Sequence, residues 1–184
     1  MTTSPQPLPL AAPSDDELMG QLALGSSAAL DELVARHRER LVRLGVRTLG
    51  DRGRAEDVAQ ETFLRVFRHA PSYHPRGQFV AWLLTIASRL CLNASRDRDR
   101  RAELPLDCSP HPAAPSSPER ALELRELRTA MARLRPRYRL ALVLKAVEGL
   151  SYREIAGILE CSEADVANAV FRARKALARE LGGR

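Results

Sequence analysis

Aromatic residues are scarce in this sequence, and positive charge exceeds negative charge. Phe, Tyr and Trp make up 4% of the 184 residues, whereas hydrophobic residues make up 45%. This composition favours small helical units packed with Leu, Val and Ala over a β-sandwich. The 29 Lys and Arg residues outnumber the 23 Asp and Glu residues, which gives a formal net charge of +6. Such a charge favours a polyanionic partner, nucleic acid first and an acidic protein second.

Cysteines are few and widely spaced. Cys91, Cys108 and Cys161 form neither a disulfide framework nor a Cys-x-x-Cys pair. Cys108 and His111 are close in sequence, but a closed zinc site needs about four ligands. We therefore expect no metal site and no cofactor.

Membrane segments and enzyme motifs are also missing from the sequence. No apolar run approaches the ~20 residues that span a bilayer. The N-terminus has Pro and Ser where a signal peptide needs a basic start and an apolar stretch. There is no glycine-rich phosphate loop, HExxH motif or GxSxG motif. We expect a cytoplasmic protein that is not an enzyme and has no membrane partner.

Proline divides the chain into segments. Residues 1–13 are Pro-rich and predict a disordered N-terminal tail. Residues 102–118 hold five prolines and show no helical or strand periodicity, which predicts a flexible linker. Two helical units remain, over residues 14–101 and 119–184. The sequence therefore predicts an all-α protein of two small helical domains joined by a flexible Pro-rich linker.

The first unit predicts four helices. Ser14 and Glu17 form a capping-box pattern that opens a short helix ending at Gly25. Apolar residues at helical spacing predict a second helix before Gly50, a third from about 55 to 69, and a fourth from Phe79 into an Arg-rich end. The loop before the fourth helix reads "APSYHPRGQ" and is marked by its prolines and glycine.

The block from residue 55 to 101 combines acids, aromatics and bases. Asp57, Gln60 and Glu61 share one face of the third predicted helix, and solvation alone is the simplest interpretation of such a face. The loop and helix after it place aromatic residues beside Arg. Single-stranded bases need this combination, because it offers stacking together with phosphate contacts.

The second unit contains the run "GLSYREIAGILECSEADVANAVFRARKAL". It predicts helices over about 152–159 and 163–180, joined by a short turn, with capping boxes at Ser151 and Ser162. One interpretation is a plain pair of antiparallel helices in a bundle. The tight turn, the basic end and the overall charge favour a helix-turn-helix instead.

Together the two blocks resemble a sigma factor of RNA polymerase, of the extracytoplasmic-function (ECF) type in the sigma-70 family. "EDVAQETFLRVFRH" resembles the polymerase-binding helix of that family, and "FVAWLLTIASRL" resembles its promoter-melting helix. "RLRPRYRLALVLKAVEGLSYREIAGILECS" resembles the approach to its helix-turn-helix. The resemblance implies sigma region 2 in residues 14–101 and region 4 in residues 119–184. It also implies a role in promoter specificity and promoter melting during transcription initiation.

The resemblance implies three groups of site residues. The polymerase-binding group, which would contact the β′ clamp, is Asp57, Gln60, Glu61 and Phe63. The group at the −10 element, where loop 72–78 would capture a flipped base, is Tyr73, His74, Arg76, Gln78, Trp82, Arg89, Asn93 and Arg96. The group at the −35 element is Ser151, Tyr152, Arg153, Glu163, Asp165, Asn168, Arg172, Arg174 and Lys175.

The implied partners are core RNA polymerase, through its β′ clamp and β flap, and promoter DNA. The tethered layout would also suit an anti-sigma factor that wraps both halves. Two other functions stay open. One is a helix-turn-helix regulator that binds duplex DNA without polymerase, which would leave the block at 55–101 unexplained. The other is a sigma-like interaction protein with weakened −35 binding.

This sequence departs from the family pattern at several positions. Ser88-Arg89 stands where many members have Arg-Asn, and Asn93 replaces a frequent Asp. Glu160 occupies a turn position usually held by Gly, which is strained if the residue must be left-handed. In the predicted recognition helix, "ADVANA" over 164–169 replaces the common Gly-Thr-Val-Lys-Ser-Arg. Two expected bases are therefore missing.

Acids lead the predicted recognition helix. Glu163 and Asp165 can serve a local purpose, because acids cap a helix N-terminus and complement its dipole. They could instead accept hydrogen bonds from cytosine, with Asn168 pairing with adenine. A third interpretation is that −35 binding has weakened and that promoter choice rests on the −10 element.

Overall fold

The structure, a computed structural model, describes residues 12–101 and 117–182. Within these ranges the chain forms eight α-helices and one 3-10 turn, without any strand. The predicted all-α class is thereby confirmed. The tail predicted over 1–13 and the linker predicted over 102–118 lie almost entirely outside the described residues.

The first unit consists of four α-helices and the 3-10 turn, and polar side chains cap the first three helices. Their bounds are α1 (Asp15–Ala23), α2 (Ser27–Leu49), α3 (Arg52–His69), η1 (Ala70–Ser72) and α4 (Phe79–Arg101). The capping box predicted at Ser14 is present, with the Glu17 carboxylate accepting from the Ser14 backbone N–H at 2.6 Å. Asp51 accepts from the Arg54 backbone N–H at 2.9 Å. This cap starts α3 at Arg52 rather than near Ala55, where the sequence placed it.

Two small residues let α2 and α3 approach closely. A Cβ added at Gly45 of α2 would lie 2.7 Å from the Ala55 Cβ of α3. Because that distance is well inside van der Waals contact, any larger residue at 45 would push the helices apart. This crossing fixes the position of α3, which carries several of the candidate site residues.

The second unit contains α5 (Pro118–Ala132), α6 (Pro136–Ala146), α7 (Tyr152–Leu159) and α8 (Glu163–Leu181). Helices α7 and α8 form the predicted helix-turn-helix, and the capping boxes at Ser151 and Ser162 are both present. Glu160 in the turn is left-handed, with φ 51°, and its backbone N–H donates to the Ala156 carbonyl. Glu160 therefore adopts the left-handed conformation of the glycine that usually occupies this position.

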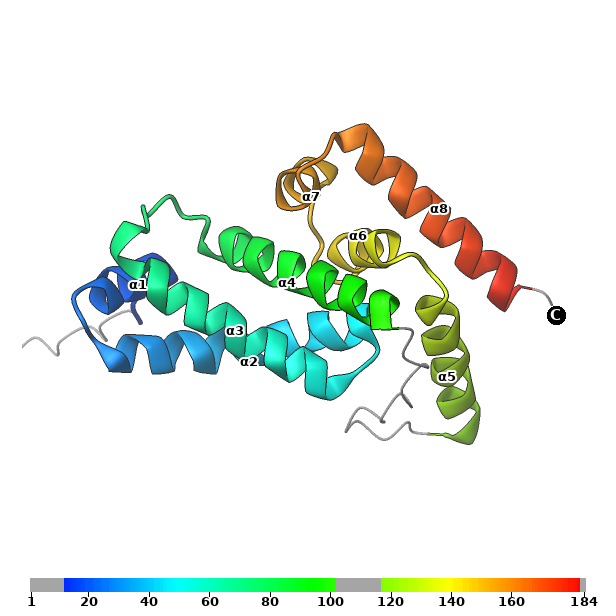
Figure 1. Ribbon diagram of the computed structural model, residues 1–184, viewed down its shortest axis with the longest axis horizontal. Coiled ribbons are helices and arrows are strands. Elements are labelled where there is room, and N and C mark those ends of the chain that lie inside the picture. The colour runs from blue at the N-terminus through cyan, green and yellow to red at the C-terminus, as the bar shows by residue number, and fades with distance from the viewer. Residues whose placement is uncertain (1–11, 102–116, 183–184) are drawn as a thin grey trace, which may run out of the picture.

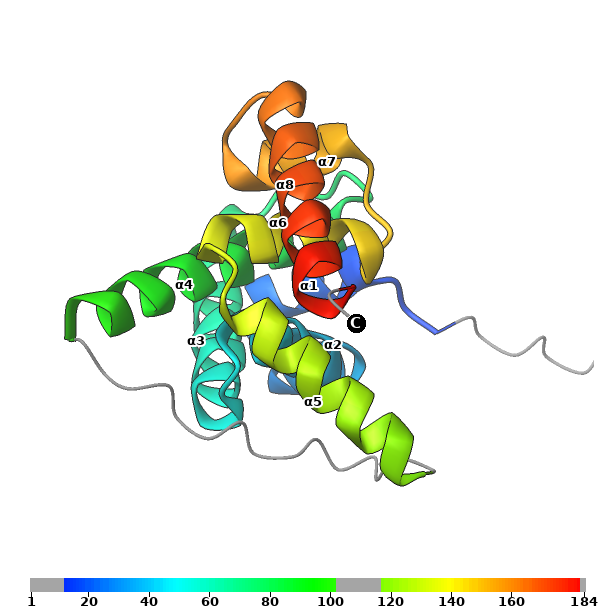
Figure 2. The same ribbon diagram turned by 90° about the vertical axis from the view of Figure 1, so that its right-hand side faces the viewer.

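The two units also pack against each other, a contact that the sequence pattern did not predict. Figures 1 and 2 show α6 and α7 lying over α2 and α4, and one hydrophobic core continues across the junction. Arg40 of α2 pairs with Glu148 at 2.6 Å. Arg89 of α4 pairs with Glu160 of the helix-turn-helix.

Arg139 is the most deeply buried polar link across the junction, with 2% of its surface exposed. It donates from Nη1 to the Thr48 carbonyl at 2.7 Å, and from Nη2 to the Ala132 and Leu134 carbonyls at 2.6 and 3.0 Å. Thr48 and Ala132 lie in the last turns of α2 and α5. Because C-terminal carbonyls lack helical partners and carry partial negative charge, one guanidinium stabilises two helix ends.

Candidate nucleic-acid and polymerase interface

A concave pocket lies where the loop after η1 meets α3 and α4. Its volume is about 540 Å³, within the range of about 300–1,000 Å³ that is common for ligand pockets. We call it the loop pocket, and it is lined by Arg65, His69, Ser72, Tyr73, His74, Arg76, Gln78, Trp82, Ile86 and Arg89. The lining combines guanidinium groups with an indole and a phenol ring, so it offers positive charge beside stacking surfaces.

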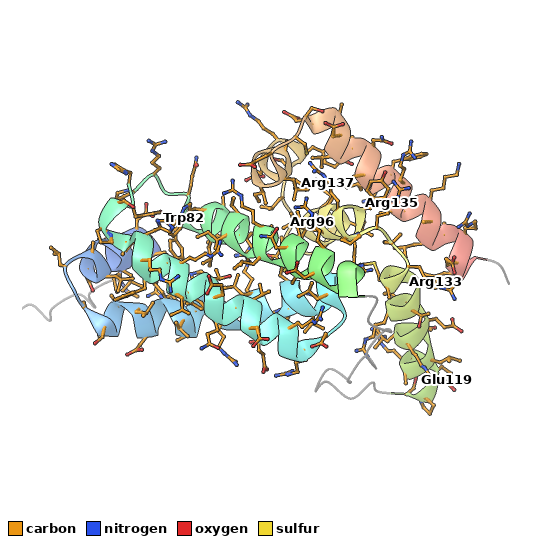
Figure 3. All side chains as sticks on the ribbon, in the orientation of Figure 1. Trp82, Arg96, Glu119, Arg133, Arg135 and Arg137 are labelled. Atoms are coloured by element: carbon orange, nitrogen blue, oxygen red, sulfur yellow. The ribbon has the colours of Figure 1, made fainter. Side chains whose placement is uncertain are left out.

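Most residues predicted for the −10 element line the loop pocket. Tyr73, His74, Arg76, Gln78, Trp82 and Arg89 do so. Asn93 and Arg96 do not line it; both are exposed farther along α4. Figure 3 shows Trp82 near the loop and Arg96 toward the other end of the same helix. The predicted set therefore divides into a pocket and an exposed extension.

Sequence reasoning missed Arg65 and Ile86 in the pocket lining. Arg65 is one helical turn before His69, and Ile86 is one turn after Trp82, so spacing along each helix was the available signal. Both were overlooked because each has an ordinary explanation in sequence. Arg65 pairs with Glu61 at 2.9 Å, and Ile86 belongs to an apolar helical stripe.

Tyr73 is turned inward beneath the loop. Its ring centroid lies 5.0 Å from that of Trp82 and 6.1 Å from that of Phe79. Its hydroxyl donates to Asp16 Oδ1 of α1 at 2.6 Å. Burial, followed by the neighbouring Asp16 carboxylate, raises the pKa of Tyr73 above its ordinary value. Tyr73 thus supplies a neutral aromatic wall rather than a hydroxyl that faces the solvent.

Three of the four predicted polymerase-binding residues, Asp57, Gln60 and Glu61, lie on one side of α3. Asp57 and Gln60 are exposed and Glu61 is half-buried, whereas Phe63 is buried and belongs to the hydrophobic core. The ion pair between Glu61 and Arg65 links this side of the helix to the loop pocket.

Two exposed apolar residues extend the same side of α3. Leu64 is 43% exposed and Phe67 is 54% exposed, and they follow Gln60 by one and two helical turns. They are not among the residues predicted from the sequence. We call Asp57, Gln60, Glu61, Leu64 and Phe67 the α3 face. A face of this kind, with apolar side chains among polar ones, resembles a protein-binding surface more than a solvated one.

At the start of α8, Asp165 is engaged in a local cap. Its Oδ2 accepts from the Ser162 hydroxyl at 2.7 Å and from the Ser162 backbone N–H at 3.2 Å. These bonds, the hydroxyl bond first, lower the pKa of Asp165 below its ordinary value. Glu163 is exposed in the same turn. The capping interpretation is therefore correct for Asp165.

The exposed face of α8 combines an amide, an aromatic ring and bases. Asn168, Phe171, Arg172 and Lys175 follow one another at helical spacing, and Arg174 is exposed beside them. Arg172 Nε donates to Asn168 Oδ1 at 3.0 Å. Phe171 is 63% exposed and is not among the residues predicted for the −35 element. An exposed aromatic side chain could contact a thymine methyl group in a groove.

The three residues predicted at the start of α7 differ in the contacts that their side chains already make. The Ser151 hydroxyl donates to Glu154 Oε2 at 2.6 Å and accepts from the Glu154 backbone N–H. The Lys145 ammonium lies 5.1 Å from the centroid of the half-buried Tyr152 ring. Arg153 is exposed. Of the three predicted residues here, Arg153 is the one best placed to reach a phosphate.

Comparisons with known proteins agree with the architecture. The sigma-70 region 2 family matches residues 33–101, and the sigma-70 region 4 family matches residues 124–177. RNA polymerase sigma-H factor from Pseudomonas aeruginosa is 31% identical over 186 residues, covering 94% of this chain and 96% of that protein. The chain belongs to the ECF sigma factors of the sigma-70 family. Sigma factors act with RNA polymerase in transcription initiation, as the sequence predicted for this one.

Two further sigma factors are similar to this chain. SigE from Mycolicibacterium smegmatis is 40% identical over 164 residues, covering 84% of this sigma factor but 63% of that protein. CarQ from Myxococcus xanthus is 36% identical over 137 residues, covering 73% of this chain and 78% of that protein.

Two solved structures share the fold of this sigma factor. CnrH, in complex with the cytosolic domain of CnrY, has a TM-score of 0.68 at 28% identity and covers 91% of this chain and 97% of its own. RpoE from Bartonella quintana, in complex with the anti-sigma factor NepR, has a TM-score of 0.70 at 24% identity. It covers 83% of this chain and 96% of its own, and its likeness concerns the fold alone.

Within residues 12–101 and 117–182, no group of three or more His, Cys, Asp or Glu side chains is placed to hold a metal ion. Cys108 and His111 lie outside these ranges. Among the described helices, none has the length and hydrophobicity that a membrane span requires.

Proposed function

We propose that this sigma factor directs core RNA polymerase to its promoters and melts them by capturing a non-template base of the −10 element in the loop pocket. The observation that carries the proposal is the pocket itself, which combines Trp82 and Tyr73 with Arg65, Arg76 and Arg89. Flipping a base costs a few kcal/mol. Stacking is worth about 1–3 kcal/mol per base, so stacking and phosphate contacts together offset that cost.

The α3 face binds the β′ clamp of polymerase in this proposal. Leu64 and Phe67 supply apolar anchors, and Asp57, Gln60 and Glu61 supply polar contacts around them. Interfaces commonly derive most of their affinity from a few such anchors inside a polar rim. The face adjoins the loop pocket through Arg65, so polymerase binding and base capture take place on neighbouring surfaces of α3.

Region 4 binds the −35 duplex through the exposed face of α8 and meets the β flap of polymerase. Arg172, Arg174 and Lys175 supply phosphate contacts, and Asn168 and Phe171 are available to bases. The capping role of Asp165 argues against direct reading of cytosine by this residue. We further propose that the protein works in the cytoplasm, where polymerase and promoters are found.

An anti-sigma factor is a further proposed partner. The support is that RpoE of Bartonella quintana, which shares the fold, was solved in complex with the anti-sigma factor NepR. The contacts of α6 and α7 with α2 and α4 hold the two halves side by side, so that one partner can reach both.

The test is transcription by core polymerase reconstituted with the full chain on a promoter library randomised at the −10 and −35 elements. We expect transcripts whose templates share a −10 sequence. Replacing residues 72–78 with the loop of another ECF sigma factor should change the preferred −10 bases. Binding of duplex DNA without any effect on polymerase would instead identify a regulator. Binding of polymerase without transcripts would identify a sigma-like interaction protein.

A further inference from the structure

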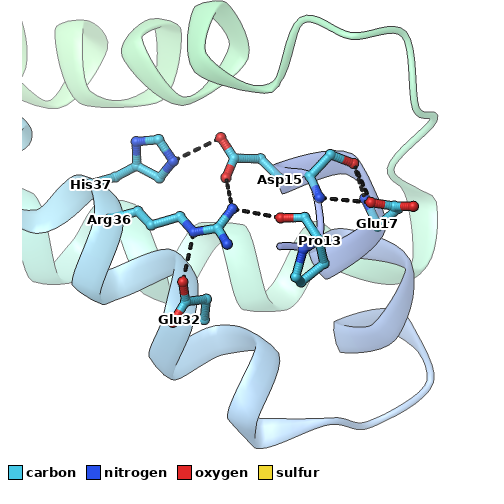
Figure 4. Close-up of polar contacts among 7 residues, drawn as sticks. Pro13, Asp15, Glu17, Glu32, Arg36 and His37 are labelled. Carbon is cyan, nitrogen blue, oxygen red and sulfur yellow. Dashed lines mark hydrogen bonds and ion pairs between the residues drawn. The ribbon is translucent and has the colours of Figure 1, made fainter. Parts of the chain in front are cut away.

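Three consecutive acids open α1, and each makes a different contact. Glu17 closes the capping box with Ser14 at 2.6 Å. Asp15 reaches α2, where its carboxylate lies 2.9 Å from His37 Nε2 and 3.2 Å from Arg36 Nη1 (Figure 4). Asp16 reaches the loop between η1 and α4. The local explanation of acids at a helix N-terminus therefore accounts for Glu17 but leaves Asp16 unexplained.

Both carboxylate oxygens of Asp16 are used by the loop between η1 and α4. Oδ1 accepts from the Tyr73 hydroxyl at 2.6 Å, and Oδ2 accepts from the Gly77 backbone N–H at 2.7 Å. Gly77 is left-handed, with φ 64°. The two donors stand on either side of His74 and Arg76, so one carboxylate holds both ends of the segment that carries these pocket residues.

These bonds act on a part of the loop that has no regular secondary structure. Hydrogen bonds to an ionised carboxylate are about twice as strong as neutral ones. Residues 73–78 lie between η1 and α4 and form no regular secondary structure. The Tyr73 ring is itself packed on Trp82, so the Asp16 bond fixes the loop relative to the stacking surface of the pocket.

We propose that Asp16 is a positioning residue for −10 recognition, which holds loop 73–78 in the conformation that reads the flipped base. The inference rests on the proposed function of the loop pocket. Asp16 does not touch DNA and acts through Tyr73 and Gly77. Its loss should therefore impair the choice of −10 base while leaving the α3 face and α8 as they are.

The experiment uses polymerase holoenzyme reconstituted with the full chain and a promoter library randomised at the −10 element. Sequenced transcripts give the base preference at each position. Asp16→Ala should reduce that preference by about fivefold or more at one position, since one base pair in a recognised site is commonly worth about 5- to 150-fold in affinity. Core binding and −35 preference should stay unchanged.

Two further variants test whether Asp16 acts through the loop. Asp16→Asn keeps one carbonyl oxygen as an acceptor and should give an intermediate preference. Tyr73→Phe removes one of the two donors, and its effect should vanish when it is combined with Asp16→Ala, because the two residues form one interaction. If Asp16→Ala fails to fold, these milder variants carry the test.

Glu17→Ala is the matched control, because it removes an acid from the same helical turn without a contact to the loop. An equal loss of −10 preference in Glu17→Ala would show that only the stability of α1 matters, and would overturn the inference. So would a wild-type preference in Asp16→Ala. If the wild-type chain itself showed no −10 preference, the proposed function would fail first and the inference with it.

Discussion

The helices α1 and α8 begin alike in sequence but differ in what their acids do. Both open with a serine capping box, at Ser14 and Ser162, and both carry more than one acid in the first turn. In α1, Asp15 and Asp16 reach α2 and the pocket loop. In α8, Asp165 stays within its cap, and Glu163 is exposed.

The difference follows from what surrounds each helix start. The N-terminus of α1 is packed against the rest of region 2, so acids that do not form the cap find hydrogen-bond donors on other elements. The N-terminus of α8 projects from the helix-turn-helix. Similar capping boxes therefore do not predict which contacts the acids make with other elements. The comparison predicts that the acids at the start of α1 support a built site, whereas the acids at the start of α8 restrain affinity for DNA.

The largest expected effect concerns polymerase binding by region 2. Gln60→Ala combined with Glu61→Arg should weaken core binding by about 100-fold or more, since charge reversal in an interface adds repulsion to the lost contacts. Leu64→Ala with Phe67→Ala should also weaken it, because it removes the apolar anchors. Affinity for core polymerase is the measurement, and circular dichroism checks helicity.

Asn168→Ala combined with Arg172→Ala on α8 is the control for that prediction. It alters an exposed face of region 4 and should leave core binding within a fewfold of wild type. Equal binding by the α3 variants and the wild type would remove the α3 face from the polymerase interface.

The next effect concerns the junction between the regions. Arg139→Met should lower the free energy of unfolding by about 2–4 kcal/mol, because it leaves buried carbonyls without their donor. Arg135→Met is the control. Arg135 is exposed and lies 5.8 Å from the Tyr138 ring centroid, so its loss should cost less than about 1 kcal/mol. The measurement is thermal or denaturant unfolding of the full chain. Equal losses of unfolding free energy in the two variants would show that the Arg139 contacts contribute little to stability.

A smaller effect is expected at the start of α8. Asp165→Thr with Ala167→Lys adds a base and removes an acid, so duplex binding should tighten. The slope of log affinity against log salt should steepen by about one unit, since each neutralised phosphate contributes ~0.9. An arginine at 169, as in the common family pattern, is unsuitable because Ala169 is 6% exposed.

Asp31→Thr with Ala35→Lys on α2 is the matched control for the salt titration. Both residues are exposed, and the change in net charge is the same. Its slope should stay close to that of the wild type. A similar rise in both variants would mean that overall charge, rather than the position on α8, controls binding.

The smallest expected effect concerns the free energy of unfolding at low pH. Hydrogen bonds from Ser162 lower the pKa of Asp165, and those from Ser151 lower the pKa of Glu154. A lowered native-state pKa adds stability above the unfolded-state pKa, and this stability is lost as pH falls through the native-state value. Unfolding free energy should therefore decrease below about pH 4. Between pH 7 and pH 3, the free energy of unfolding of Ser162→Ala should decrease less than that of the wild type. An equal decrease would show that the Ser162 cap does not contribute to the pH dependence.

Capping and periodicity made much of the fold predictable. The boxes at Ser14, Ser151 and Ser162 are local signals, because each depends on residues only three positions apart. The helix-turn-helix helices therefore match their predicted ranges closely. The start of α3 was placed too late because the cap that Asp51 forms was not among the capping signals recognised in the sequence.

The candidate site was predictable where its residues lie together in one loop or one helix turn. Tyr73, His74, Arg76 and Gln78 are close in sequence, and they do line one pocket. Phe67 and Phe171 were missed because a helix presents apolar residues to core and to partner alike, and sequence spacing does not separate the two.

The sequence by itself determined the helices, their caps and the family to which this sigma factor belongs, because these depend on short-range patterns. Only the tertiary structure decided which acid of α1 meets the pocket loop, which arginine spans the two regions and which aromatic rings remain exposed. Those contacts join residues such as Asp16 and Gly77, or Thr48 and Arg139, that are far apart along the chain. Their partners are set by how whole helices pack, and no local pattern records that packing.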